Sequence, residues 1–379
     1  MKRYLHLFAL FAGFLVLPAS TLHAQGFDPA LIINDLGLNS ASLPISKKAG
    51  WAPKKIVAFI MPGLPQDKEV YVKALEIAGG EAEVIFAGGH NFSFSKENLA
   101  DVDAILGLCS AALLKISGPK LRWLHNYSVG MDRCTGATPE QLDNITFTNN
   151  KRLSGPPIAE HSMAMLLALA RDLPDYMRSQ QSGKWKRKST KRSDFGELSG
   201  KTMLVAGLGG IGTEVARRAH GMGMRVIATR NSSRTGPDFV DYVGLSDELH
   251  KLAAEADVVV NALPLTTSTT ALFDKSFFDA VKPGAIFISV GRGKSTVTAD
   301  LVAALQSKRL YGAGLDVTDP EPLPSTSPLW GMRNVIITPH VAANSIDSTH
   351  RSMVIAIENL RRYVAGEAML NVVDLNSGY

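Results

Sequence analysis

The fold is decided by one stretch of the chain, Met203-Leu204-Val205-Ala206-Gly207-Leu208-Gly209-Gly210-Ile211-Gly212. Its first four residues are apolar, which is typical of a buried strand, and its last six fit the pattern G-x-G-x-x-G. Residues 213–220 follow as a predicted helix. A glycine turn that joins a buried strand to a helix favours a dinucleotide-binding unit over a purely structural turn.

The glycines of this turn have separate tasks in such a unit. Gly207 permits the tight bend, Gly209 lets the backbone approach a pyrophosphate, and Gly212 permits close packing of the helix on the strand. Gly210 and Ile211 lie in the same turn, and the helix that follows it offers unpaired N–H groups and a favourable dipole to an anion at its N-terminus. We therefore expect these five residues to contact a dinucleotide cofactor.

The segment after the next predicted strand bears on which dinucleotide is bound. It reads Thr229-Arg230-Asn231-Ser232-Ser233-Arg234 and contains no acid. NAD sites usually carry an acid about 20 residues past the glycines, where it accepts hydrogen bonds from the ribose hydroxyls. Guanidinium groups and small hydroxyls suit a 2′-phosphate instead. We therefore predict that Arg230, Ser232 and Arg234 bind NADP in preference to NAD; the alternative is that both arginines face solvent.

Short β-branched runs alternate with helical stretches along the rest of the chain. They form two series, at 56–60, 82–86, 104–109, 121–126 and 145–148, and at 203–207, 225–230, 258–263, 285–290, 312–317 and 335–338. A long helix predicted at 156–171, ending before Pro174, separates the two series, and a last helix is predicted at 342–366. This alternation predicts an α/β protein with two doubly wound parallel sheets.

Length and composition agree with this organisation. At roughly 100 to 200 residues per domain, a chain of 379 residues suggests two domains. With 45% apolar and 20% charged residues, the chain is neither disordered nor collagen-like. A net charge of +5 is mild for this size and gives no reason to expect nucleic acid as a partner. We interpret the basic stretch at 184–192 as a solvated connector that could contact a partner subunit.

The cysteine count limits the available sulfur chemistry. Cys109 and Cys134 are the only two cysteines, too few for a disulfide framework or a four-thiolate metal site, and no metal is predicted. They can form one disulfide at most, and the sequence favours the unpaired state.

The N-terminus has the layout of a secretory signal. Lys2 and Arg3 precede an apolar run at 5–17, and Ala24 ends a stretch of small and polar residues. We predict a signal peptide at 1–24, export to the periplasm, and no stable membrane span after cleavage, because the run is shorter than the ~20 residues that cross a bilayer. If the signal is not used, the protein is expected in the cytoplasm. Residues 25–53 follow as an arm without a predicted role.

Three polar residues follow the last three predicted strands of the second series. Arg292 comes after the strand at 285–290, Glu321 after that at 312–317, and His340 after that at 335–338. Ligands of open α/β sheets bind outside the carboxyl ends of the strands. We therefore expect these side chains to meet near the nicotinamide end of the cofactor.

These residue types suit the reduction of a carbonyl group. A ketone that receives a hydride becomes an alkoxide and needs a proton, which His340 could supply near neutral pH. A carboxylate beside an imidazole favours its protonated form and holds its orientation, the task we assign to Glu321. Arg292 could anchor the carboxylate of a 2-oxo acid and stabilise developing charge.

The motifs around these residues form an ordered set. They are Ile158-Ala159-Glu160-His161, Gly183-Lys184-Trp185, Leu263-Pro264-Leu265-Thr266, Val290-Gly291-Arg292-Gly293, Gly312-Ala313-Gly314-Leu315-Asp316-Val317, Glu321-Pro322-Leu323-Pro324, Pro328-Leu329-Trp330 and Thr338-Pro339-His340. From about residue 54 to residue 372 the chain closely resembles the D-isomer-specific 2-hydroxyacid dehydrogenases, with likeness to glyoxylate and hydroxypyruvate reductases.

The resemblance implies how the chain is divided. It implies a flavodoxin-like substrate domain at 54–155, completed by 342–379, and a Rossmann-like NAD(P)-binding domain at 156–341. It also implies a homodimer and an oxidoreductase that transfers a hydride between a nicotinamide cofactor and a small 2-oxo acid or D-2-hydroxy acid.

The resemblance further implies roles for single residues. Arg292 binds substrate, Glu321 pairs with His340, and His340 is the acid/base. In the turn at 128–132, the backbone N–H groups of Val129 and Gly130 cradle the substrate carboxylate. Pro264 belongs to a motif expected at the cofactor. Asp316 is expected near the nicotinamide carboxamide, although it could equally support the end of its strand.

Departures and alternatives remain. Ser289 stands where the family commonly has Asn, and Thr267-Ser268 replace its usual Pro-Glu. Relatives of formate dehydrogenase place a glutamine beside the histidine, which Glu321 argues against. Because a fold alone never proves catalysis, a non-catalytic NAD(P)-sensing binding protein on the same scaffold is the alternative.

Overall fold

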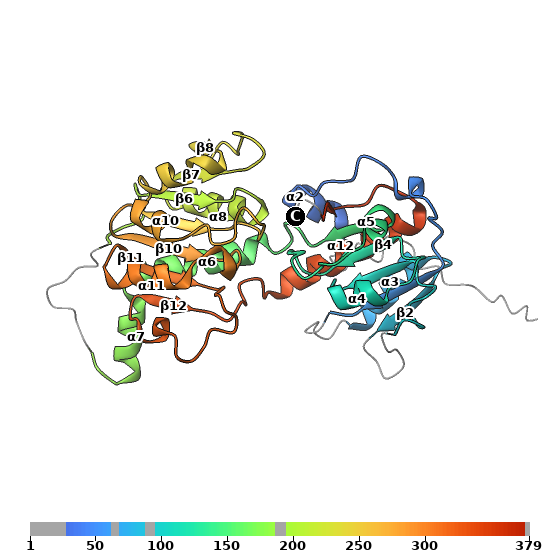
Figure 1. Ribbon diagram of the computed structural model, residues 1–379, viewed down its shortest axis with the longest axis horizontal. Coiled ribbons are helices and arrows are strands. Elements are labelled where there is room, and N and C mark those ends of the chain that lie inside the picture. Colours follow the sequence, from blue (N-terminus) through green and yellow to red (C-terminus); the bar gives the residue numbers. More distant parts are fainter. Residues whose placement is uncertain (1–27, 62–67, 88–94, 186–194, 376–379) are drawn as a thin grey trace, which may run out of the picture.

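The computed structural model describes residues 28–61, 68–87, 95–185 and 195–375, which form two lobes, each built around a sheet (Figure 1). This arrangement confirms the predicted α/β class with two parallel sheets. The predicted signal peptide at 1–24 lies outside the described residues. Within them, no helix combines the length and the apolar character needed to cross a bilayer.

The first lobe holds a six-stranded sheet in the order β13-β5-β4-β3-β1-β2. Its strands are β1 (Lys55–Phe59), β2 (Glu83–Ala87), β3 (Ala104–Gly107), β4 (Trp123–Asn126), β5 (Thr146–Asn149) and β13 (Val372–Val373). All pairs are parallel except the edge pair β13–β5, which is antiparallel. Among the described residues, three helices connect the strands, α3 (Lys68–Gly79), α4 (Ala111–Ile116) and α5 (Pro139–Asn144). The predicted strands of the first series match within two residues, whereas β13 was not predicted.

The second lobe holds a seven-stranded parallel sheet in the order β12-β11-β10-β9-β6-β7-β8. Its strands are β6 (Thr202–Ala206), β7 (Arg225–Thr229), β8 (Tyr242–Gly244), β9 (Val258–Asn261), β10 (Ala285–Ser289), β11 (Leu310–Leu315) and β12 (Val335–Ile337). Its helices are α8 (Gly210–Gly221), α9 (Leu249–Ala253), α10 (Lys275–Ala280) and α11 (Thr298–Gln306). Strand order reverses between β6 and β9, so the crevice expected for a ligand lies directly beyond the glycine turn.

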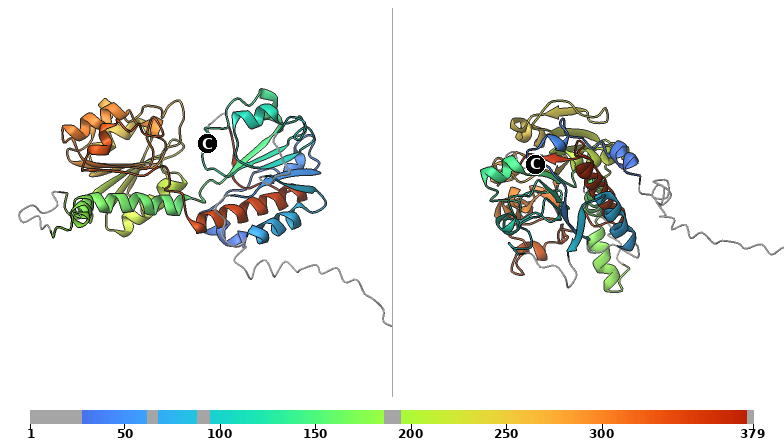
Figure 2. Two further views of the ribbon diagram at one scale, coloured as in Figure 1. Left: turned by 90° about the horizontal axis from the view of Figure 1, so that it is seen from below. Right: turned by 90° about the vertical axis from the view of Figure 1, so that its right-hand side faces the viewer.

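Two long helices lie where the chain passes between the lobes. Figure 2 shows α6 (Gly155–Ala170) along the second lobe and α12 (Ile346–Ala365) along the first. α12 begins four residues later than predicted, because Ser345 caps it by accepting a hydrogen bond from the N–H of Ser348. An unpredicted helix, α7 (Leu173–Gln181), follows α6; Pro174 lies in its first turn, where a missing N–H costs nothing.

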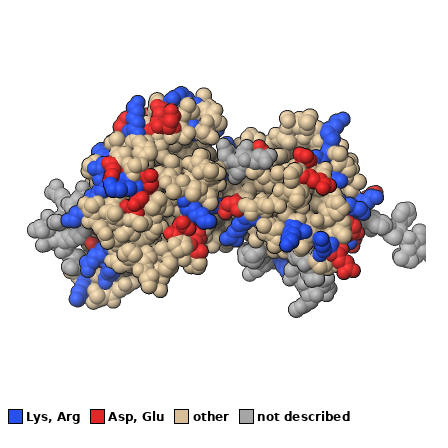
Figure 3. Space-filling view, in the orientation of Figure 1, with Lys and Arg blue, Asp and Glu red and all other residues tan. Residues whose placement is uncertain are grey.

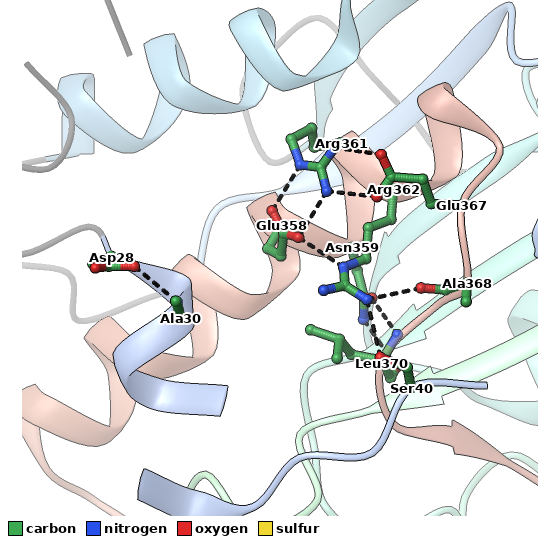
Figure 4. A network of polar contacts seen from close by, with 10 residues as sticks. All are labelled: Asp28, Ala30, Ser40, Glu358, Asn359, Arg361, Arg362, Glu367, Ala368 and Leu370. Carbon is green, nitrogen blue, oxygen red and sulfur yellow. Dashed lines mark hydrogen bonds and ion pairs between the residues drawn. The ribbon is translucent and has the colours of Figure 1, made fainter. Parts of the chain in front are cut away.

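The described part of the arm without a predicted role, residues 28–53, is packed on the first lobe. It forms α2 (Pro29–Leu36) and a 3-10 turn, and the indole Nε1 of Trp51 donates to the carbonyl of Tyr363 at 2.9 Å. Figure 4 shows Arg362 reaching both Glu358 and the hydroxyl of Ser40. The arm is therefore part of the folded lobe and holds the C-terminal half of α12.

Cys109 and Cys134 form a disulfide, with their Cα atoms 5.0 Å apart. The expectation that they stay unpaired was wrong. They are 25 residues apart in sequence, but Cys109 follows β3 and Cys134 follows β4, and these strands are neighbours in the sheet. Sheet pairing thus brings them together, which cysteine spacing alone could not indicate.

Candidate functional site

The glycine turn has the geometry of an anion site. α8 begins at Gly210 with Gly209 as its N-cap, and Gly207 has a φ of +96°, which favours glycine. A Cβ on Gly212 would collide with the carbonyl oxygen of Gly207, so helix and turn are in close contact. A Cβ on Gly209 would meet nothing within 4 Å. Because open space faces a helix N-terminus there, the turn fits the pyrophosphate of a dinucleotide.

The loop that holds Pro264 lies beside the glycine turn. A Cβ on Gly207 would come within 3.0 Å of Leu263 and 3.1 Å of the carbonyl oxygen of Ala262. Pro264 itself is exposed, and its carbonyl accepts a hydrogen bond from the hydroxyl of Thr269 at 2.7 Å. Its predicted place beside a cofactor is compatible with this position.

The two arginines after β7 differ in their partners. Arg234 donates to Glu248 at 2.5 Å and to the hydroxyl of Tyr242 at 3.1 Å. Hydrogen bonds from the Tyr242 hydroxyl, the Leu245 N–H and Arg234 lower the pKa of Glu248 to about 2, so this carboxylate is charged. Arg230 donates to the carbonyl of Thr235 at 3.1 Å and has no acidic partner among the described residues. Of the two, Arg230 has the charge available for a phosphate, and the exposed Ser232 lies two residues further on.

His340 and Glu321 meet beyond the ends of β11 and β12. Nδ1 of His340 donates to Oε1 of Glu321 at 2.7 Å, and each side chain is a little over two-fifths exposed, at 42% and 44%. His340 has a φ of +54°, in the left-handed region that side chains rarely adopt. Because Nδ1–H is engaged by the carboxylate, Nε2 is the nitrogen left to exchange a proton.

Asp316 accepts hydrogen bonds from residues on both sides of His340 in the sequence. It is buried, and its carboxylate accepts hydrogen bonds from the N–H of Val341 at 2.9 Å and of Ala342 at 3.1 Å. The Thr338 hydroxyl donates to the same carboxylate at 2.7 Å, while the N–H of His340 donates to the Asp316 carbonyl at 2.8 Å. Asp316 thus has the contacts of a strand-end support, the second of its two predicted roles.

Arg292 spans the two lobes. It follows β10 in the second lobe, and its Nε donates to Oδ1 of Asp132, in the first lobe, at 3.1 Å. A Cβ on Gly130 would collide with Nη2 of Arg292, so the guanidinium lies directly against the predicted carboxylate loop. The structure therefore brings Arg292 against Gly130, in the loop that also contains Val129. Figure 3 shows that the molecule is narrower where the two lobes meet, and that basic and acidic side chains lie beside this narrow part.

Asn126 and Asn149, at the ends of β4 and β5, were missed by the sequence analysis. The amide of Asn149 donates to the carbonyl of Val129 at 2.7 Å, and that of Asn126 donates to the carbonyl of Gly130 at 3.0 Å. In a trans peptide the N–H points opposite to the preceding carbonyl, so holding the Val129 carbonyl also aims the Gly130 N–H. The sequence signal that could have found them is that each is a polar residue at the end of a buried strand, and that the two strands are neighbours in the sheet.

Within the described part of the chain, no group of three or more His, Cys, Asp or Glu residues could hold a metal ion. The acid, base and anion-binding groups described above are side chains and backbone amides. They offer a proton donor, an anion-binding arginine and a dinucleotide turn, each of which follows the carboxyl end of a strand of the second sheet.

Comparison with known proteins gives the family. Residues 163–342 match the NAD-binding domain of D-isomer-specific 2-hydroxyacid dehydrogenases. The chain is 32% identical to a glyoxylate reductase of Pyrococcus furiosus over 281 residues, which cover 72% of this chain and 82% of that protein. The chain belongs to the D-isomer-specific 2-hydroxyacid dehydrogenase family. The predicted family and enzyme class are thereby confirmed: this dehydrogenase is an NAD(P)-dependent oxidoreductase of 2-oxo or 2-hydroxy acids, and nothing found supports the non-catalytic alternative.

Other relatives of this dehydrogenase agree. It is 32% identical to the glyoxylate reductase/hydroxypyruvate reductase of Mus musculus, over 68% of this chain and 78% of that protein. Among solved structures, the NADPH-dependent glyoxylate/hydroxypyruvate reductase of Sinorhizobium meliloti, in complex with NADP and sulfate, matches with a TM-score of 0.71 and 27% identity, covering 86% of this chain and all (100%) of that one. A family member from Xanthobacter autotrophicus, in complex with NADPH and MES, matches with a TM-score of 0.68 and 30% identity over 86% of this chain and 100% of that one.

Proposed function

We propose that this dehydrogenase is an NADPH-preferring reductase of small 2-oxo acids of the glyoxylate and hydroxypyruvate type. The observation that carries the proposal is the contact of Arg292, from one lobe, with the Val129–Gly130 loop of the other. A guanidinium and two backbone N–H groups that converge on one place form a site for a small carboxylate.

The chain's own residues account for binding and proton transfer. Arg292 and the Val129–Gly130 amides bind the carboxylate of the 2-oxo acid and orient its keto group. The bound reduced nicotinamide supplies a hydride. Nε2 of His340 gives its proton to the alkoxide oxygen, and Glu321 holds the ring through Nδ1–H while its charge stabilises the imidazolium before transfer.

Asp316 acts in this scheme by positioning His340. Its buried carboxylate fixes the backbone of residues 341 and 342, immediately after the histidine. A contact to the nicotinamide carboxamide would need one of its oxygens to accept a further hydrogen bond. Both assignments remain part of the proposal, with positioning favoured by the contacts described above.

The preference for NADPH rests on the segment after β7. Arg230 and Ser232 would hold the 2′-phosphate, with Arg234 beside them in its ion pair with Glu248. Glu248 is a charged carboxylate, but Arg234 neutralises it locally, so it does not act as a free acceptor for ribose hydroxyls. The NADPH- and NADP-bound relatives support this preference.

We also propose that the lobes act as predicted, with 54–155 and 342–379 as the substrate domain, 156–341 as the cofactor domain, and two chains forming a homodimer. Leu173, Tyr176 and Met177 on α7 are exposed by 45%, 42% and 58%. Apolar side chains grouped on one short helix of the second lobe are suited to burial against a second copy.

Export to the periplasm remains a proposal. It is supported by the Cys109–Cys134 disulfide, because disulfides persist in oxidising compartments and are rare in the cytosol. Sequencing the N-terminus of the mature protein tests it. Gln25 as the first residue is expected, and Met1 would place the chain in the cytoplasm.

The experiment that tests the function is a panel of 2-oxo acids offered with NADPH and, separately, with NADH. Turnover of glyoxylate or hydroxypyruvate with a higher kcat/KM for NADPH is expected. Absence of turnover with every 2-oxo acid would refute the reaction, and a clear preference for NADH would refute the assignment of Arg230.

A further inference from the structure

The Cys109–Cys134 disulfide lies at the base of the loop that holds Val129 and Gly130. Cys109 comes two residues after the end of β3, and Cys134 ends the loop that begins after β4. Both cysteines are buried, with 4% and 5% of their surface exposed. We call residues 128–134 the anion loop. The covalent link therefore joins Cys134, at the far end of the anion loop, to Cys109, which follows the carboxyl end of β3 next to the proposed substrate site.

Hydrogen bonds connect this link to the anion loop itself. The N–H of Cys109 donates to Oδ1 of Asn126 at 3.1 Å, and the amide Nδ2 of the same Asn126 donates to the carbonyl of Gly130 at 3.0 Å. On the other side, the N–H of Cys134 donates to the carbonyl of Met131 at 2.8 Å. One asparagine and one short turn thus lie between the disulfide and the two amides that are proposed to bind the substrate.

The rest of the loop is anchored in the first lobe by single hydrogen bonds and by the buried side chain of Met131. The N–H of Ala111 donates to the Arg133 carbonyl at 3.1 Å, and Asn149 holds the Val129 carbonyl. Asp132 and Arg133 are exposed. A loop held by single hydrogen bonds and one buried side chain can still shift locally, whereas a covalent link at its end removes much of that freedom.

We propose that the Cys109–Cys134 disulfide is a positioning element of the substrate site, which keeps the Val129 and Gly130 amides in place for the substrate carboxylate. The proposal rests on the proposed function, because it takes the occupant of this loop to be a 2-oxo acid. A cradle of amides binds an anion well only when its donors are already in place, so loosening the loop weakens substrate binding.

Reduction of the disulfide is the direct way to loosen the loop. Dithiothreitol, a small dithiol, breaks the S–S bond by exchange: each cysteine sulfur gains one electron and one proton, and the reagent is oxidised to its cyclic disulfide. The cofactor turn lies in the other lobe, so the affinity for NADPH is expected to stay unchanged. The disulfide therefore acts on KM for the 2-oxo acid more than on kcat.

The test compares four samples of the full-length protein: oxidised, reduced with dithiothreitol after folding, C109S/C134S, and Thr135→Ala as a matched exposed control next to Cys134. We expect KM for glyoxylate to rise about tenfold in the reduced protein and in the double variant, with kcat within about threefold. Thr135→Ala should behave like the oxidised wild type, and dithiothreitol should not affect the double variant. The Kd for NADPH, measured by fluorescence titration, should be equal in all four.

Hydrogen exchange of residues 128–134 gives a readout that does not depend on turnover. Faster exchange in this loop after reduction, with unchanged exchange in β6 and α8, is expected. A lower Tm with unchanged KM and unchanged loop exchange would assign the disulfide to stability alone and overturn the proposal, as would free thiols in the oxidised protein.

Failure of the proposed function gives a different result. If the oxidised protein reduces no 2-oxo acid, the reaction is wrong, and the exchange measurement still shows whether the disulfide holds the loop. Should the double variant fail to fold, the protein reduced after folding carries the test.

Discussion

Glu321 accepts a hydrogen bond from Nδ1 of His340 at 2.7 Å, although 19 residues separate the two in sequence. Glu321 belongs to the loop after β11, and His340 follows β12. Because the two strands are parallel neighbours, their carboxyl ends lie at the same edge of the sheet. This pairing fixes which nitrogen of the imidazole can exchange a proton with substrate.

Replacing Glu321 by Gln tests that pairing. A glutamine lacks the charge that stabilises the imidazolium, so less of His340 carries the proton that Nε2 gives to the alkoxide, and kcat for glyoxylate should fall about 10²-fold. Glu321→Asp, which keeps the charge on a shorter side chain, should recover part of the rate. Steady-state kinetics with NADPH measure both, and an unchanged kcat in the glutamine variant would contradict the role of Glu321.

Replacing Arg292 by Lys tests the carboxylate site. A lysine keeps the charge but cannot offer the paired N–H groups of a guanidinium, so kcat/KM for glyoxylate should fall by about 10². The affinity for NADPH, which is measured separately, should stay the same because the glycine turn is unaffected. Equal kcat/KM in the variant and the wild type would exclude Arg292 from substrate binding.

Arg230 and Arg234 provide a matched pair for the cofactor preference. Arg230→Ala should raise KM for NADPH about tenfold, the equivalent of one charge-assisted hydrogen bond, and leave KM for NADH unchanged. Arg234→Ala should have a smaller effect, because this guanidinium is already engaged by Glu248. A larger rise in KM for NADPH in Arg234→Ala than in Arg230→Ala would show that the Arg234–Glu248 ion pair opens to bind the 2′-phosphate.

Much of the fold and of the site could be predicted from local sequence. The glycine turn and the long apolar strands are local patterns. The sequence also shows that Arg292, Glu321 and His340 each follow a predicted strand, and the carboxyl ends of parallel strands meet at one edge of the sheet. β8 and β13, with three and two residues, were missed because such short runs carry no periodicity. α7 was missed because Pro174 was interpreted as a helix end.

The unpredicted parts of the site depend on tertiary neighbours. Pairing of Cys109 with Cys134, the amides of Asn126 and Asn149, and the contact of Asp132 with Arg292 all join elements that are distant in sequence. The arm at 28–53 had no pattern of its own, because its contacts are made by single side chains such as Trp51. No spacing rule relates these residues before the strands are placed.

His125 gives a prediction about stability. Its ring is fully buried between Thr148 and Asn150, and burial lowers its pKa from the ordinary value of 6.5 to about 4. Between these values the unfolded chain binds a proton that the folded chain does not, so stability falls as pH drops from 6.5 towards 4, by about 3 kcal/mol over the window.

Urea unfolding of the wild type and of His125→Gln at pH 7 and pH 4.5 measures this contribution. The variant should be less stable at pH 7, because it loses buried hydrogen bonds, but should lose less stability on acidification than the wild type does. Equal losses in the two proteins would show that His125 does not titrate in this window.

In the proposed reaction His340 gives the proton to the reduced keto group, and His340→Ala removes this proton donor. Reduction of glyoxylate and hydroxypyruvate with NADPH should fall by about 10³-fold or more, while the Kd for NADPH should stay within about twofold of the wild-type value. Turnover at the wild-type rate in this variant would show that His340 is not the proton donor.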